Sequence, residues 1–277
     1  MLLFAIPFPA IDPVLIEIGP IHIRWYALSY IVGIFIGWWW ARRLAGNAKL
    51  WGPAGAPLAP HDIDDFVVWA TLGIVLGGRI GYVLFYDLPR FVESPGSVFA
   101  IWEGGMSFHG GFLGTVLAMV LFARSRKIPA WSLIDTIAAS VPPGILLVRI
   151  ANFINGELWG KPTDLPWGIA FPMAGPEPRH PTQLYEGLLE GAVLFLLLLY
   201  LTHRQKRLRQ PAFVSGVFAA WYGAVRILIE FVRVPDVQIG YLWGPLTLGM
   251  LLSIPMLVAG IALMIWAVRR NPAAIRP

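Results

Sequence analysis

The stretch GPLTLGMLLSIPMLVAGIALMIWAV, residues 244–268, contains no charged side chain. A helix needs about 20 apolar residues to cross the hydrocarbon core of a bilayer, so this stretch is long enough to span a membrane. Six similar stretches precede it, at roughly 25–41, 63–86, 104–123, 132–153, 184–201 and 212–231. The sequence therefore predicts an all-α integral membrane protein with about seven transmembrane helices.

The overall composition supports this interpretation. The 277 residues are 57% hydrophobic and 13% charged, whereas soluble domains usually carry about 25% charged residues. Because the spans use most of the chain, we expect a single polytopic membrane domain over residues 1–277. The first basic residue is Arg24, so we do not expect a cleaved signal peptide. The pI near 9.7 is attributed to topology signals, and no nucleic-acid partner is expected.

The distribution of Lys and Arg predicts the orientation. Most of the 21 basic residues lie in every second connection and in the tail, at 42–50, 124–127, 203–209 and 269–277. Such segments face the cytoplasm, which places the N-terminus outside and the C-terminus in the cytoplasm. The connection 155–183 then lies outside. It is apolar enough, with Trp159, Trp167 and Phe171, to form a small ordered outer-face cap rather than a free linker.

Local signals predict helix starts and one break. The acidic residues Asp62, Asp64 and Asp65 suit the N-terminus of the second span. Ser132 with Asp135 is typical of a capping box for the fourth span, and Thr182 is a candidate cap for the fifth. Pro142 and Pro143 lie within the fourth span and should kink or break it.

Ionisable groups inside a membrane are costly, and here they converge at one depth. The predicted topology places polar groups from six spans near the outer ends of their helices. These are Tyr26, Arg79, Tyr82, His109, Arg149, Glu186, Glu190, Tyr222, Arg226 and Glu230. The spacing puts Arg149, Asn152 and Asn155 on one helical face, and Tyr222, Arg226 and Glu230 on another.

Two interpretations of these charges compete. In the first, Arg226 and Glu230 only neutralise each other and hold the bundle together. The second, a polar site open to the outer leaflet, is favoured by several aligned sets at one level. Residue types alone do not decide whether Arg79, Glu186 and Glu190 touch a substrate or only each other.

Arginine presents a planar fork that fits phosphate oxygens, so the site suits an anionic phospholipid headgroup. His109, in Ser107-Phe108-His109-Gly110-Gly111, is a candidate general base, although a single histidine is often structural. The residues around Ser107 give no support to a serine dyad. The chain has no cysteine and no cluster with metal-ligand spacing, so no metal or cofactor is expected.

Three other classes of protein are weighed against an enzyme acting on lipid. A transporter for an anionic solute would place its charges near the midplane. An intramembrane protease would need a nucleophile with a base, or paired aspartates, and the sequence shows neither. A binding protein for an anionic lipid is compatible with the same residues.

Residues 148–160, VRIANFINGELWG, closely resemble the signature of the bacterial phosphatidylglycerol–prolipoprotein diacylglyceryl transferase family. Four further segments resemble the same family: 23–26 (IRWY), 107–111 (SFHGG), 180–186 (HPTQLYE), and the stretch from Arg226 through Glu230 to 233–236 (RVPD). The resemblance covers nearly the whole chain in order. One departure is Val148, where the family usually has glycine, and this should affect packing rather than chemistry.

The resemblance implies a reaction and its partners. The enzyme would move the diacylglyceryl group of phosphatidylglycerol to the lipobox cysteine thiol in the signal peptide of an exported prolipoprotein, releasing glycerol-1-phosphate. It would work in the bacterial cytoplasmic (inner) membrane, with its active site facing the outer leaflet of the lipid bilayer.

The resemblance also implies which residues matter. Those matching Arg149 and Arg226 would bind phospholipid and be essential, and the one matching His109 would be important for activity. The other functional positions would be Tyr26, Asn152, Glu157, Gly160, Glu230 and Arg233. In the mechanism that we expect, His109 takes the thiol proton, the two arginines bind the leaving phosphate, and Asn152 and Asn155 supply neutral hydrogen bonds.

Overall fold

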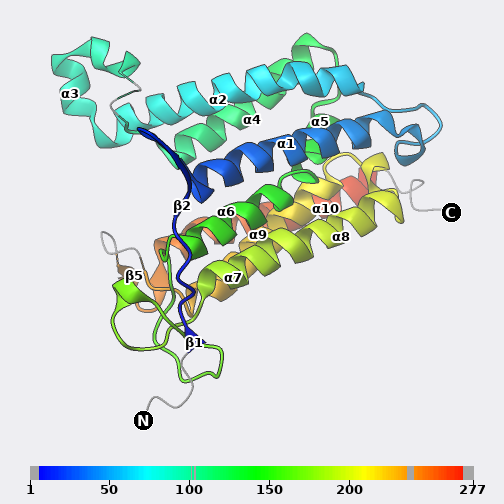
Figure 1. Cartoon of the computed structure of the whole chain (residues 1–277). Helices are drawn as coiled ribbons and strands as arrows, with labels where there is room; N and C mark the ends of the chain where they lie inside the picture. The colour runs from blue at the N-terminus through cyan, green and yellow to red at the C-terminus, as the bar shows by residue number, and fades with distance from the viewer. Residues whose placement is uncertain (1–5, 101, 103, 236–239, 271–277) are drawn as a thin grey trace. The chain divides into compact units, whose positions relative to one another are not determined.

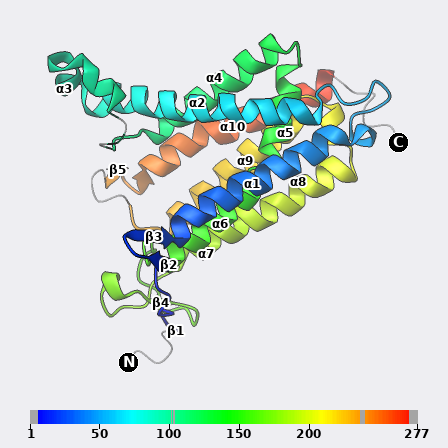
Figure 2. The same cartoon turned by 45° about the horizontal axis from the view of Figure 1, so that its top comes forward.

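The computed structural model describes residues 6–100, 102, 104–235 and 240–270, and most of them are helical. The chain forms two compact units, a larger one of residues 1–40 and 135–277 and a smaller one of residues 41–134. The boundaries fall within two helices, α1 (Trp25–Gly46) and α5 (Ala130–Ala138). Figures 1 and 2 show the elements of both units, which are described separately below.

The smaller unit is built on two long helices, α2 (Pro60–Tyr86) and α4 (Phe108–Ser125), which run side by side (Figures 1 and 2). Small residues allow this close approach: a Cβ atom added to Gly73 would lie 2.6 Å from the Gly114 carbonyl oxygen. The short helices η1 (Ala48–Leu50), α3 (Leu88–Glu93) and η2 (Pro95–Phe99) lie in the connections.

The larger unit contains α6 (Pro142–Ile154), α9 (Phe213–Glu230), α10 (Leu248–Arg270) and a composite helix. That helix joins α7 (Thr182–Glu186), the π-helical η5 (Gly187–Val193) and α8 (Leu194–His203) without interruption. Helices α9 and α10 also meet through glycine, since a Cβ atom on Gly223 would lie 2.9 Å from the Leu257 nitrogen. The 3-10 helix η6 (Arg207–Arg209) precedes α9.

Three two-stranded sheets belong to the larger unit. Strands β2 (Val14–Ile18) and β3 (Ile21–Arg24) are antiparallel, as are β5 (Tyr241–Trp243) and β6 (Leu246–Thr247). The parallel pair joins β1 (Ile6–Pro7) to β4 (Ile169–Ala170).

The segment 155–183 lies in the larger unit. It contains β4 and η4 (Pro172–Ala174). Phe171 is fully buried, and its ring contacts the rings of Phe8, Phe153 and Trp159.

Among the described residues, six helical segments are long and apolar enough to cross a membrane: Pro60–Tyr86, Phe108–Ser125, Ala130–Ile154, Thr182–His203, Phe213–Glu230 and Leu248–Arg270. They coincide with six of the seven predicted spans. The remaining prediction, 25–41, coincides with α1, whose 22 residues include four Trp and two Tyr. Large apolar side chains such as Phe85 and Phe108 are exposed on these helices, as expected for contact with lipid.

The proline break in the fourth span is confirmed. Helix α5 ends at Ala138 and α6 begins at Pro142, so Pro142 and Pro143 occupy the first turn of a new helix. Proline is well tolerated there because the first amides of a helix have no intrahelical acceptor. The break thus creates a second helix N-terminus within the span.

Two predicted caps are wrong and one acidic cap is confirmed. Helix α5 begins at Ala130, so Ser132 lies inside its first turn and does not cap it. Thr182 is the first helical residue of α7, and its hydroxyl donates to the Leu158 carbonyl at 2.7 Å instead. Asp62 does stabilise the start of α2, where its carboxylate accepts from the Ala59 amide at 2.7 Å.

Asp135 caps a different helix from the one that the sequence suggested. Its carboxylate is fully buried and accepts from the amides of Ala212 and Ser215, both at 2.8 Å. These amides belong to the N-terminus of α9, where a carboxylate is favoured by both the free N–H groups and the helix dipole. Asp135 therefore ties α5 to the helix that carries Arg226.

Replacing Asp135 with alanine should lower the free energy of unfolding by about 2 kcal/mol, because two buried amides lose their acceptor. Thermal unfolding of the purified protein in detergent measures the effect. Asp164→Asn, at an exposed position, is the matched control and should unfold like the unaltered protein. Equal midpoints for Asp135→Ala and the control would contradict the capping role.

Candidate functional site

A single buried carboxylate, that of Glu186, contacts three arginines. Its Oε2 atom lies 3.0 Å from Arg149 Nη1, and its Oε1 atom lies 2.5 Å from Arg226 Nη1 and 2.8 Å from Arg233 Nη1. The Glu186 side chain is 0% exposed, whereas those of Arg149 and Arg226 are 17% and 16% exposed. The arginines therefore have an open side, and the glutamate that joins them does not.

Two further glutamates complete the group. Glu190 Oε2 lies 3.5 Å from Arg149 Nη2, and Glu230 Oε1 lies 2.5 Å from Arg226 Nη2 and 3.9 Å from Arg233 Nε. We call these six residues the arginine–glutamate cluster: Arg149, Arg226, Arg233, Glu186, Glu190 and Glu230. With all six groups ionised the formal charges cancel, which makes burial in an apolar surrounding tolerable.

The local sequence explains how the carboxylates reach Arg149. Glu186 ends α7 and Glu190 lies in the π-helical η5, a helix form that is often found at functional sites. Gly187 and Gly191 let this helix approach α6 closely, since a Cβ atom on Gly191 would lie 2.7 Å from Leu146 Cβ. The two glutamates therefore face the helix that carries Arg149.

Helix α9 and the segment after it supply the other half of the cluster. Arg226 and Glu230 are one turn apart on α9, and Arg233 follows the helix, where it forms a β-bridge with Gly160. Glu230 Oε2 accepts from the Thr247 hydroxyl at 2.6 Å, and Thr247 in turn accepts from the Met250 amide at the start of α10. Glu230 is therefore held from two helices.

The arginines are occupied by carboxylates. The cavity lined by Arg226, Glu230, Arg233 and Thr247 has a volume of only about 20 Å³, room for about one water molecule. Arg149 contacts Glu186 and Glu190 and also shares a side-chain hydrogen bond with Tyr222. Within the described part of the chain, neither Glu186 Oε2 nor Glu190 Oε1 has a well-directed hydrogen bond, although Glu186 Oε2 lies 3.0 Å from Arg149. An anion approaching from the exposed side would therefore compete with these carboxylates.

Asn152 and Asn155, predicted to donate to a substrate, both donate to Glu157. Their Nδ2 atoms lie 2.8 Å and 3.1 Å from Glu157 Oε1. The Glu157 carbonyl also accepts from Gln183 Nε2 at 2.5 Å. These bonds fix the end of α6 and the turn that follows it.

Close packing explains why residue 160 is glycine. A Cβ atom there would lie 2.6 Å from the Val232 carbonyl oxygen and 2.7 Å from His180 Cβ. No other residue fits between these two strands of backbone. Gly160 thus lets the turn after α6 contact the segment that carries Arg233.

Tyr26 lies in the first turn of α1 and belongs to the larger unit. Its hydroxyl is 3.2 Å from that of Tyr30, and the two rings pack edge to face. Tyr26 is only partly buried, so part of its surface remains available for a ligand.

His109 is the second residue of α4 and belongs to the smaller unit, whereas every member of the arginine–glutamate cluster belongs to the larger one. The Ser107 hydroxyl accepts from the Gly110 amide at 3.2 Å and so caps α4. This bond gives Ser107 a structural role, in agreement with the absence of a serine dyad motif. The predicted position Asp236 lies outside the described residues.

The largest difference from the sequence-based prediction concerns Glu186 and Arg79. Glu186 is the centre of the cluster, and its signals in the sequence were its i,i+4 spacing to Glu190 inside an apolar span and its place at the end of the segment 180–186. Arg79 donates to main-chain carbonyls and is not part of the cluster.

A short chain of hydrogen bonds in the larger unit was also missed. Trp167 Nε1 donates to the Tyr185 hydroxyl oxygen at 2.7 Å, and that hydroxyl lies 3.2 Å from His180 Nδ1. Burial lowers the pKa of His180, which favours its neutral imidazole. The chain orients Tyr185, the residue before Glu186.

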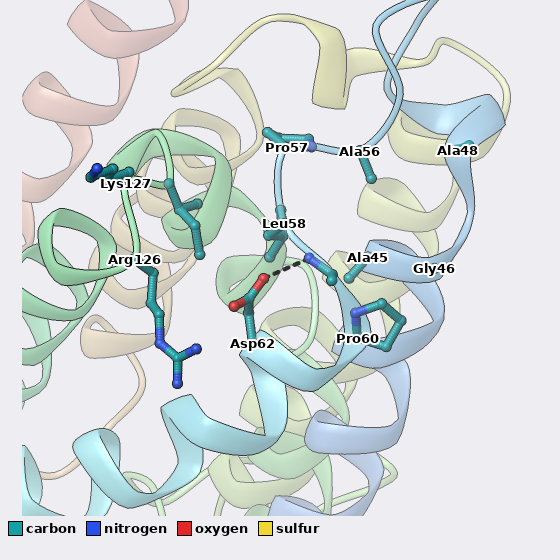
Figure 3. A pocket seen from close by; sticks show the side chains of 12 residues that line it. Ala45, Gly46, Ala48, Ala56, Pro57, Leu58, Pro60, Asp62, Arg126 and Lys127 are labelled. Carbon is teal, nitrogen blue, oxygen red and sulfur yellow. Dashed lines mark hydrogen bonds between the residues drawn. The ribbon is translucent and has the colours of Figure 1, made fainter.

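The smaller unit contains a cavity of about 480 Å³ that is not a candidate for the chemistry (Figure 3). It is lined mainly by alanine, proline and leucine together with Arg126 and Lys127. Its carboxylate, Asp62, bonds the Ala59 amide, as the dashed line in Figure 3 marks. None of the predicted site residues lines this cavity. No group of three or more His, Asp and Glu able to hold a metal ion occurs among the described residues.

Comparison with known proteins identifies relatives of the whole chain. A family model described as prolipoprotein diacylglyceryl transferase matches residues 13–266. The phosphatidylglycerol–prolipoprotein diacylglyceryl transferase of Mesorhizobium japonicum is 59% identical over 261 residues, which covers 94% of this chain and 91% of that protein. The Brucella canis protein of the same name is 56% identical over 274 residues, with 98% and 96% coverage.

Glu186→Gln should lower the free energy of unfolding by about 3 kcal/mol, because one negative charge is lost among three buried arginines. The thermal unfolding midpoint of the purified protein is the measurement. Glu177→Gln removes an exposed charge from the segment that leads to the same helix and is the matched control. If both variants unfold at the same temperature, Glu186 does not hold the cluster together.

Proposed function

The chain belongs to the prolipoprotein diacylglyceryl transferase family, and we propose that it transfers the diacylglyceryl group of phosphatidylglycerol to the lipobox cysteine thiol of a prolipoprotein. The second product is glycerol-1-phosphate. The observation that carries this proposal is the convergence of Arg149 and Arg226 on one buried carboxylate, with part of each guanidinium exposed.

We propose that the whole chain, residues 1–277, acts as one polytopic domain of the bacterial inner membrane. In this arrangement α1 is a seventh span beside the six apolar helices, with Trp and Tyr at its ends suited to the membrane interface. The distribution of basic residues favours an external N-terminus, an external segment 155–183 and a cytoplasmic C-terminus. The active site then faces the outer leaflet, where an exported prolipoprotein arrives.

The reaction is a displacement at carbon. A free thiol has a pKa of about 8.5 and reacts as the thiolate, so its proton must first be removed. In our proposal an imidazole nitrogen of His109 accepts that proton. The sulfur then attacks the glyceryl carbon that bears the phosphate ester, the carbon–oxygen bond breaks, and its electron pair stays on the phosphate oxygen.

Arg149 and Arg226 act on the charge that develops in this step. The phosphate passes from a diester with one negative charge to a monoester that gains another, so guanidinium groups bind the leaving group more strongly than the substrate. Binding that increases toward the transition state is the kind that accelerates a reaction. Arg149, whose contact with Glu190 is 3.5 Å, would exchange that carboxylate for the phosphate.

The other site residues position these groups. Glu230 and Glu186 orient Arg226, and Arg233 shares both carboxylates with it. Asn152 and Asn155 act through Glu157, not as direct donors to the lipid.

Two positions complete the site. Gly160 permits the close contact that places Arg233, because no Cβ atom fits there. Tyr26, partly exposed at the start of α1, is assigned to substrate binding.

The purified protein, incubated with phosphatidylglycerol and a lipobox peptide, should form the thioether product, and Arg149→Lys should lower kcat/KM about 100-fold. Lysine keeps the charge but loses the planar fork that holds Glu186, Glu190 and a phosphate together. Arg124→Lys, at an exposed position on α4, is the control and should retain activity. No product from the folded, unaltered protein would reject the proposed function.

His109→Gln should lower kcat at least 100-fold near neutral pH, because the thiol loses its base. The variant should follow the thiolate fraction of the substrate and gain activity toward alkaline pH, whereas the unaltered enzyme should depend less steeply on pH. A pH–rate profile from pH 6 to 9 measures both, and full activity of the variant over this range would exclude His109 as the base.

A further inference from the structure

Arg79, on α2 of the smaller unit, has an unusual set of partners for a buried arginine. It is 5% exposed, and its guanidinium donates to four main-chain carbonyls. The Nε atom lies 3.0 Å from the Val98 oxygen, Nη2 lies 2.5 Å from that of Ser97, and Nη1 lies 2.6 Å from that of Gly104 and 3.2 Å from that of Gly105.

These bonds use most of the donors that arginine has. A guanidinium carries five N–H groups, and four acceptors from two separated stretches of one loop surround this one. Arg79 therefore has little capacity to bind a phosphate as well. The bonds close the loop onto α2 at two points, around Ser97–Val98 and at Gly104–Gly105.

The second contact point, Gly104–Gly105, depends on its two glycines. Gly104 and Gly105 have φ angles of +84° and +78°, a region that favours glycine. A Cβ atom on Gly105 would lie 2.5 Å from the Tyr82 ring, and the same ring lies under the Arg79 guanidinium at 5.7 Å. Arginine, tyrosine and the two glycines thus form one packed unit, which we call the Arg79 clamp (Arg79, Tyr82, Gly104 and Gly105).

The clamp leads directly to His109. Two residues after Gly105, the Ser107 amide donates to the Gly78 carbonyl at 2.9 Å, and the Ser107 side chain caps α4. His109 follows in the first turn of that helix. The position of the imidazole therefore depends on where α4 begins, and the clamp fixes that start against α2.

We infer that Arg79 is a positioning residue for the transfer reaction, acting through the clamp on the start of α4 and on His109. The inference rests on the proposed function, in which His109 is the base. A misplacement of about 1 Å at a reacting group can cost about 100-fold in rate, so loss of the clamp is expected to matter for catalysis as well as for folding.

The test is a double-mutant cycle between Arg79→Met and His109→Gln, assayed with phosphatidylglycerol and a lipobox peptide on the full-length protein. Arg79→Met should lower kcat about 100-fold and change KM for phosphatidylglycerol less than threefold, because the arginine–glutamate cluster keeps its own contacts. The kcat of Arg79→Lys should lie between those of Arg79→Met and the unaltered enzyme, since an ammonium offers three donors for four carbonyls. The double variant should be no slower than His109→Gln alone.

The pH–rate profile distinguishes positioning from a general loss of stability. Arg79→Met should follow the same pH–rate profile as His109→Gln, because a displaced imidazole no longer accepts the thiol proton. Gly105→Ala, which breaks the clamp from the loop side and keeps Arg79, should reproduce the effect if Arg79→Met fails to fold. Arg90→Met, on α3 and more exposed, is the matched control and should behave like the unaltered enzyme.

Each outcome has one interpretation. No thioether from the unaltered protein would reject the proposed function, whereas product formation with independent, multiplicative losses in the cycle would overturn only the role of Arg79. An unchanged pH dependence in both Arg79→Met and Gly105→Ala would overturn it as well, as would a fully active His109→Gln variant.

Discussion

The contact of three guanidinium groups with the Glu186 carboxylate is the interaction on which the larger unit depends. A charge in an apolar surrounding needs an opposite charge and hydrogen bonds, and one carboxylate cannot neutralise three arginines. Glu190 and Glu230 provide the remaining charge. The π-helical turn, the glycines that face α6 and the bond from Thr247 all follow from the need to bring these carboxylates together.

Sequence reasoning predicted the features that depend on local spacing. Arg226 and Glu230 are four residues apart and form the expected ion pair, and Pro142 and Pro143 break the fourth span as proline must. The positions of six apolar helices also follow from the hydropathy of the chain alone. In each case the residues that determine the feature lie close together in the sequence.

The errors concern partners that are distant in sequence. Asp135 was assigned to the nearest helix start, whereas its carboxylate bonds amides about 80 residues further along the chain. Glu186 joins arginines on three other segments, and its spacing to Glu190 indicated a shared face but not what that face would meet. Spacing also cannot distinguish an arginine bound to carbonyls from one bound to carboxylates, so Arg79 resembled Arg149 until the structure showed their partners.

That difference in partners separates a structural arginine from one suited to a ligand. The carbonyls around Arg79 belong to one loop, and a phosphate could replace them only if the loop came away from α2. The carboxylates around Arg149 are ends of side chains, and a phosphate offers the same planar pairing to the guanidinium fork with equal or greater charge. In the proposed function, exchange at Arg149 would therefore change its partners while the helices stay in place. The neutral cluster can in this way be stable without lipid and still bind an anionic headgroup, because the glutamates hold each guanidinium in the geometry that the phosphate requires.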